Sequence, residues 1–195
     1  MSNIKNPIVF SANASAKIAG LIGKPEYNHR DWDLQDLQEL RHEVRKHYRA
    51  EQKMTCAYCR QPVAEISAAG SPIDHIACKS SYLQFMFEPR NLCVTCPDCN
   101  SFKRNREVMV DPVLKGSAKK KYPTDTNRFR IFHPHYDNYG DHIKRAGILY
   151  FSCSQKGAYT VYICNLARYV NSFGISNELL HDFAAVLQRH QFHEG

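Results

Sequence analysis

The sequence CAYC occupies residues 56–59, DH residues 74–75, and NLCVTCPDCNSFK residues 91–103. Two Cys-x-x-Cys pairs, Cys56/Cys59 and Cys96/Cys99, therefore enclose an Asp-His dipeptide and an asparagine. Zinc prefers tetrahedral coordination by thiolates, and each Cys-x-x-Cys turn supplies two sulfurs, so two such turns can close a structural site. The spacing predicts one structural zinc, with unrelated buried cysteines or a redox pair as the alternatives.

The other cysteines do not extend this pattern. Cys93 offers a second, overlapping pair with Cys96, but it follows Asn91-Leu92 in an expected strand or loop, so Cys96 and Cys99 are the preferred ligands. We expect Cys78, Cys153 and Cys164 to be small buried hydrophobic residues, because none has a partner at ligand spacing.

The residues between the cysteine pairs have the chemistry for hydrolysing a phosphodiester with a divalent metal. Neutral His75 can act as the general base, and the Asp74 carboxylate is a hard oxygen ligand of the kind that Mg²⁺ prefers. Asn100 can supply a second metal ligand, and Asn91 can orient the His75 imidazole by a hydrogen bond. Adjacent residues of a strand point to opposite faces, so an irregular backbone is expected at Asp74-His75. Each residue alone is commonplace; only the set indicates a site.

This set resembles the HNH, or ββα-metal, nuclease family in its form with a four-cysteine zinc site. The matching residues are Cys56, Cys59, Asp74, His75, Asn91, Cys96, Cys99, Asn100 and Lys103. The resemblance implies that His75 is the base, that Asn91 orients it, and that Asp74 and Asn100 bind Mg²⁺ or a similar metal. The position of Asn100 is often His in the family, which leaves the metal preference open.

A looser resemblance covers the C-terminal half. Pro134 through Asp137 to His142, an expected hairpin, and Asn165-Leu166-Ala167-Arg168 look like the layout of HNH nuclease subunits from Septu-type and related retron anti-phage systems. That resemblance implies an ATPase partner protein. A polar cluster here is either a second metal site or, as we favour, a structural tie between this loop and the core. Its members are His133, His135, Asp137 and His142.

Composition and periodicity predict an α+β fold in one domain with appended elements. We divide the chain into an N-terminal extension and helix (1–53, with the helix at about 31–53), an HNH core with zinc knuckles (54–110), and a C-terminal part (111–195). The C-terminal part should hold a basic loop, a hairpin of strands at 148–151 and 159–163, a short helix at 166–173 ended by Gly174, and a final helix. The apolar stripe of that final helix comprises Leu180, Phe183, Ala184 and Leu187. A further helix should start near Pro97 or Asp98.

The charge balance favours a polyanionic partner. The chain has 26 Lys and Arg against 19 Asp and Glu, a formal net charge of +7, which suits DNA. The predicted DNA-binding residues are Lys103, Arg104, Lys119, Lys120 and Lys121. The basic residues of helix 31–53 are read as a solvated face, with DNA-backbone contact as the alternative.

No apolar run approaches the roughly 18 residues that span a bilayer, and the N-terminus lacks the apolar centre of a signal peptide. We therefore expect a cytoplasmic protein that does not enter a membrane. Two other functions stay open: a non-catalytic zinc-ribbon module that binds nucleic acid or protein, and a nuclease that is silent until a partner docks on its C-terminal helix. The Asp74-His75 pair favours the enzyme, because a pure binding module needs no base beside a carboxylate.

Overall fold

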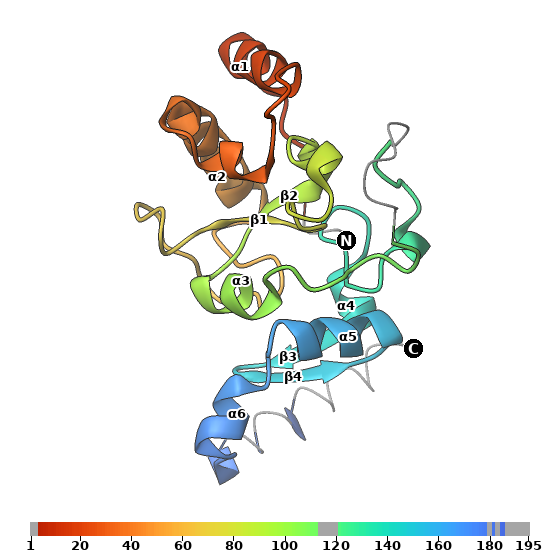
Figure 1. The fold of residues 1–195 in the computed structure, drawn as a ribbon. Helices are drawn as coiled ribbons and strands as arrows, with labels where there is room; N and C mark the ends of the chain where they lie inside the picture. Colours follow the sequence, from red (N-terminus) through yellow and green to blue (C-terminus); the bar gives the residue numbers. More distant parts are fainter. Residues whose placement is uncertain (1–3, 113–120, 179–180, 182–183, 186–195) are drawn as a thin grey trace.

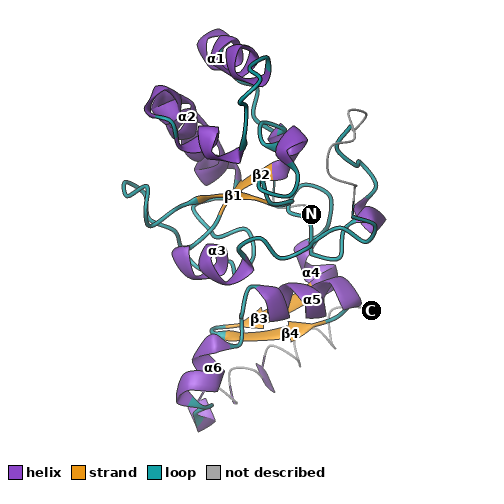
Figure 2. Cartoon of the chain, in the orientation of Figure 1, coloured by secondary structure: helices purple, strands orange, loops and turns teal. Residues whose placement is uncertain are grey.

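The computed structural model of this chain describes residues 4–112, 121–178, 181 and 184–185. Helices and two small antiparallel sheets make up an α+β fold, as expected (Figures 1 and 2). The α-helices are α1 (Ala12–Ile22), α2 (Gln38–Glu51), α3 (Pro97–Lys103), α4 (Tyr139–His142), α5 (Gln155–Ile163) and α6 (Arg168–Phe173). The strands are β1 (Ile73–His75), β2 (Leu92–Val94), β3 (Ile143–Ala146) and β4 (Leu149–Ser152).

The central unit consists of β1, β2 and α3, in that order along the chain (Figure 1). β1 and β2 pair antiparallel, with Asp74 opposite Cys93 and His75 opposite Leu92. Helix α2 is joined to this sheet through Gln52, just beyond its last residue, whose side-chain amide hydrogen-bonds both the N–H and the C=O of Val94. The Gln52 side chain thus pairs with the backbone of Val94, the last residue of β2, in the way a neighbouring strand would.

The helix expected at 31–53 is shorter than predicted. Two 3-10 helices, His29–Asp33 and Gln35–Leu37, precede α2, and Leu34 between them has φ −55° and ψ 142°, which interrupts helical geometry. Within α2, Leu40, Val44 and Tyr48 are buried at the predicted helical spacing. The amphipathic pattern therefore located the helix, while the backbone at Leu34 decided where it begins.

The C-terminal half contains a hairpin, but it is not the predicted one: the strand expected at 148–151 is present as β4, whereas the partner expected at 159–163 is not a strand. Residues 159–163 belong to helix α5, and the partner of β4 is β3, which precedes it in the chain. Gly147, with φ 56°, lies in the turn between them. The Ser154 hydroxyl accepts a hydrogen bond from the Gly157 N–H, so the segment read as a turn is the N-terminal cap of α5.

Helix ends marked by proline or glycine were predicted correctly. Pro97 is the first residue of α3 with Cys96 as its N-cap, and Gly174, with φ 76°, ends α6. Leu180, Phe183 and Leu187 of the predicted final helix lie outside the described residues. In the described part of the chain, no helix has the length and apolar character needed to cross a membrane.

Candidate functional site

The four predicted zinc ligands meet at one point. The sulfur atoms of Cys56, Cys59, Cys96 and Cys99 all lie within 4.8 Å of one another, and all four residues are buried. Over the described ranges, this is the one group of histidine, cysteine and carboxylate side chains with the spacing of a metal site. Four converging thiols without an intervening acid or lysine fit a tetrahedral metal such as zinc.

Local backbone geometry creates the two knuckles. In the first, the Cys56 N–H donates to the Gln61 carbonyl, and Arg60 adopts φ 59°, which folds the chain back so that Cys56 and Cys59 face the same point. In the second, Cys96 caps α3 and Cys99 lies in its first turn. Burial raises the pKa of the Cys56 thiol, whereas hydrogen bonding from Cys56 lowers that of Cys59.

The remaining cysteines lie elsewhere. Cys93 is buried in β2 opposite Asp74, so the preference for Cys96 and Cys99 was correct. Cys164 is buried as expected, but Cys78 is half-buried and Cys153 is exposed. The prediction for these last two was wrong, because both lie in loops that the core does not cover.

A cavity of about 370 Å³ brings three of the predicted catalytic residues together. Asp74 and His75 come from β1, and Asn100 comes from α3. No bulge interrupts the register of β1, so the expected backbone irregularity is absent; both side chains reach the cavity from the last two residues of the strand. The lining residues are Ile73, Asp74, His75, Cys78, Lys79, Asn100, Ser101 and Arg104.

The His75 imidazole is held in a defined orientation. Its Nε2 lies 3.1 Å from the Met86 carbonyl oxygen, and the Trp32 ring packs edge-on against it at 4.5 Å between centroids. A carbonyl only accepts hydrogen bonds, so Nε2 carries the proton and Nδ1 keeps its lone pair. Burial, reinforced by the charge of Lys79, lowers the pKa of His75 to about 3, so the ring is neutral at pH 7.

The Asp74 carboxylate is buried and has two protein partners. The Tyr58 hydroxyl donates to it at 2.7 Å, and Lys103 Nζ lies 3.0 and 3.1 Å from its two oxygens. Burial raises the pKa of the carboxyl even though Lys103 and Tyr58 oppose that rise. Tyr58 lies inside the first Cys-x-x-Cys turn, so the knuckle itself contributes a contact to the cavity. A large aromatic residue within a metal knuckle was the available signal for this role.

Lys103 does not have the role predicted for it. Its side chain is 0% exposed and donates to Asp74 and, at 2.9 Å, to the His75 carbonyl oxygen. A fully buried lysine whose ammonium group is held by Asp74 and the His75 carbonyl cannot contact DNA. The cationic side chains that do line the cavity are Arg104, which was predicted, and Lys79, which was not.

Asn91 also differs from its prediction. Its amide accepts from the Ala77 N–H and donates to the carbonyl oxygens of Ala77 and Phe85, so its hydrogen bonds go to the backbone and not to the His75 ring. The residue therefore secures the loop that follows β1, and Met86 in that loop holds the imidazole. Asn91 acts on His75 through the backbone, which sequence spacing could not distinguish from a direct bond.

The arginines of α2 were predicted to be solvated or, as the alternative, to contact the DNA backbone. Their side chains instead hydrogen-bond carbonyl oxygens of the protein. Arg41 donates to the carbonyl oxygen of Leu34, Arg45 to that of Ser71, and Arg49 to that of Ser67. They bind the helix to the chain segments on either side of it. Of the predicted basic loop, Lys119 and Lys120 lie outside the described residues, and Lys121 is exposed.

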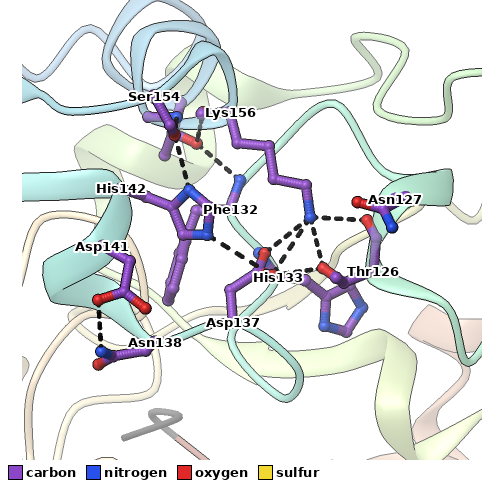
Figure 3. Close-up of polar contacts among 12 residues, drawn as sticks. Thr126, Asn127, Phe132, His133, Asp137, Asn138, Asp141, His142, Ser154 and Lys156 are labelled. Atoms are coloured by element: carbon purple, nitrogen blue, oxygen red, sulfur yellow. Dashed lines mark hydrogen bonds and ion pairs between the residues drawn. The ribbon is translucent and has the colours of Figure 1, made fainter.

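The predicted polar cluster of the C-terminal half does not have the spacing of a metal site. Within it, Asp137 contacts the His142 ring and the His133 N–H (Figure 3). Asp137 lies between His142 and Lys156, 3.6 Å from the ring Nε2 and 3.1 Å from Nζ, and it also accepts from the Thr126 hydroxyl. His135 instead donates from Nε2 to the Leu92 carbonyl oxygen at 2.9 Å. This arrangement agrees with a structural tie, because His133, His135 and His142 each hydrogen-bond a different part of the chain: the Tyr122 hydroxyl, the Leu92 carbonyl oxygen and the Ser154 hydroxyl.

Searches for similar proteins identify no relative whose properties could be transferred. No family model, no curated protein and no solved structure matches the chain.

Proposed function

We propose that this protein is a metal-dependent DNA endonuclease of the HNH, or ββα-metal, type, with a structural zinc on its four clustered cysteines. The observation that carries the proposal is the shared cavity of Asp74, His75 and Asn100, built by β1 and α3 in a strand–strand–helix unit. Two of the clustered cysteines precede that unit and two lie at the start of α3, and Tyr58, between the first two, donates a hydrogen bond to Asp74.

His75 is suited to act as the general base. The Met86 carbonyl fixes the proton on Nε2, which leaves Nδ1 able to accept a proton from a water molecule. The ring is neutral at physiological pH because it is buried. Trp32 and Met86 together restrict the ring to one orientation, which lowers the cost of reaching the reactive geometry.

Asp74 and Asn100 offer the hard oxygen atoms that would hold a divalent metal. Mg²⁺ keeps several of its waters and needs only one or two protein ligands, so a carboxylate and an amide oxygen suffice. When bound, such an ion neutralises charge on a phosphoryl group and stabilises the departing oxygen. Lys103 and Tyr58 hold the Asp74 carboxylate, which limits the rearrangement that binding would require.

The cavity also suits a phosphodiester substrate electrostatically. Lys79 and Arg104 line it alongside the reactive residues, and the chain as a whole carries a formal charge of +7. Contacts from Lys79 and Arg104 would engage the phosphate backbone of DNA and would not distinguish one base sequence from another. The looser resemblance extends the proposal to a cytoplasmic effector of an anti-phage defence complex that contains an ATPase.

The test is nicking of supercoiled plasmid DNA with Mg²⁺, Mn²⁺ or Ni²⁺ by the wild type, His75→Ala and His42→Ala. Removal of a general base costs about 10²–10⁴-fold in rate, so His75→Ala should lose detectable nicking. His42 is exposed on α2 and serves as the matched control, which should cut normally. Retained zinc and an unchanged melting temperature would show that His75→Ala is folded.

Undiminished cleavage by folded His75→Ala would rule out this mechanism. A wild type that binds DNA and zinc without cutting, with every metal and with single-stranded DNA as well, would favour the non-catalytic zinc-ribbon module.

A further inference from the structure

Arg168, the first residue of α6, lies against the cysteine cluster although it is far from it in sequence. Its Nη1 is 4.0 Å from the sulfur of Cys99, and its Nε is 3.3 Å from a carboxylate oxygen of Asp98. The Arg168 side chain is 12% exposed, whereas that of Asp98 is 53% exposed. The Arg168 guanidinium is thus largely buried and lies against the Cys99 sulfur, whereas the Asp98 carboxylate is exposed to water. An ion pair with an exposed carboxylate contributes little to stability.

One donor of this guanidinium is left without a hydrogen bond. Nε is buried and has no hydrogen-bond partner, although Asp98 lies within ion-pair distance. Nη1 has a second contact, with the Asn165 carbonyl oxygen at 3.3 Å. A buried donor without a partner costs about 1–3 kcal/mol, so the position of this guanidinium against the sulfur of Cys99 requires a physical reason.

The charge of a metal–thiolate centre supplies that reason. A divalent metal bound by four thiolates has a net charge of −2, and burying that charge is costly unless a cation or hydrogen-bond donors offset it. Arginine keeps its charge at every physiological pH and presents several N–H groups in a fixed plane. The knuckle's own arginine, Arg60, is directed elsewhere, with its guanidinium 4.4 Å from the centroid of the Tyr139 ring.

We propose that Arg168 is a positioning residue of the metal–thiolate centre, where its guanidinium donates to the Cys99 sulfur and offsets the negative charge. The inference rests on the proposed metal binding by the cysteine cluster and is independent of nuclease activity. Because Arg168 begins α6 and also contacts Asn165, it connects the α5–α6 turn to the centre. Metal binding and the placement of α6 are therefore coupled.

The experiment measures metal retention in the full chain of the wild type, Arg168→Met, Arg168→Lys and Arg106→Met. Arg168→Met removes the positive charge and the N–H donors of the side chain while keeping a similar length. Arg168→Lys keeps the positive charge but loses the planar guanidinium. Arg106 is the matched control, because its guanidinium packs on a surface tyrosine, Tyr162, at 5.3 Å. The readouts are zinc content, the rate of zinc transfer to a chromogenic chelator, and the sulfur-to-cobalt charge-transfer band of Co²⁺-loaded protein.

Loss of an outer partner typically lowers metal affinity 10–100-fold, so Arg168→Met should release zinc at least about 10-fold faster than the wild type. Its charge-transfer band should move to lower energy, because a thiolate without a hydrogen bond gives up electron density more readily. Arg168→Lys should fall between the two, and Arg106→Met should match the wild type.

Wild-type zinc release and an unshifted band in Arg168→Met would overturn the inference while leaving the metal site intact. If Arg168→Met does not fold, a wild-type rate and band in Arg168→Lys would count against the inference in the same way. A wild type that binds no more zinc or cobalt than Cys96→Ser would instead refute the metal site itself, and the inference with it.

Discussion

Lys103 and Asp74 form a buried ion pair beside the candidate catalytic histidine. Lys103 is fully buried, donates to Asp74 and to the His75 carbonyl oxygen, and lies at ion-pair distance from the second Asp74 oxygen. Removing one partner of such a pair leaves an uncompensated buried charge, which costs far more than the intact pair contributes. The pair therefore serves to hold Asp74 and the backbone of His75 in place.

Lys103→Met should lower the free energy of unfolding by about 3–5 kcal/mol, as for other broken buried pairs. The double variant Asp74→Asn/Lys103→Met should recover most of that loss, because no charge then stays buried alone. Urea denaturation of the three proteins measures both effects. Lys17→Met, which removes the partly exposed pair with Glu39 at 3.7 Å, is the control and should cost less than about 1 kcal/mol. Equal destabilisation by Lys103→Met and the double variant would contradict this account.

At the scale of the element, the start of α5 depends on one glycine. A Cβ atom at Gly157 would lie 1.8 Å from the carbonyl oxygen of His142, a backbone atom that cannot rotate away. Close packing of α5 on the end of α4 thus requires glycine in the first turn, where propensity alone would favour alanine. Tertiary contact outweighs local preference here.

Gly157→Ala should therefore destabilise the protein by about 3 kcal/mol, the cost of forcing an atom into a packed site. Gly140 in α4 is the matched control, since nothing lies within 4 Å of its Cβ position. Gly140→Ala should be neutral or stabilise by up to about 1 kcal/mol through helix propensity. Thermal and chemical denaturation compare the two variants. Similar stability of both would show that α4 and α5 are not packed as described.

Over the whole molecule, buried histidines join the C-terminal half to the central sheet. His135 donates to the Leu92 carbonyl of β2 and packs edge-on against Tyr48 of α2. Burial lowers the pKa of His135 to about 4 and that of His133 well below its ordinary value. Both rings are neutral in the folded protein, so folding excludes protons that the unfolded chain would bind.

The sign of the pH dependence follows. Because the folded pKa values lie below the unfolded value of about 6.5, stability is complete above that pH and is lost as the pH falls toward 4. Each histidine contributes up to about 1.4 kcal/mol per pH unit in this range. His135→Gln should make the slope between pH 6.5 and 4.5 shallower by about that amount, whereas His42→Gln should leave it unchanged. Denaturation midpoints across this range give the slopes; an unaltered slope in His135→Gln would refute this contribution.

Local sequence patterns alone predicted the α+β class, the two knuckles, the start of α3 at Pro97 and the end of α6 at Gly174. These features depend on neighbours a few residues apart: ligand spacing in a Cys-x-x-Cys turn, the fixed φ of proline and the left-handed conformation open to glycine. The sequence also indicated Asp74, His75 and Asn100, which the fold brings to one cavity.

Only the tertiary structure decided what those residues touch. Lys103 and Asp74 are 29 positions apart, Arg168 and Cys99 are 69 apart, and neither separation leaves a periodic signal in the chain. The strand expected at 159–163 became a helix because Ser154 caps it and because Thr160 accepts a hydrogen bond from the Phe132 N–H. Backbone propensity acts over a few residues, but burial and charge pairing act between surfaces that only folding brings together.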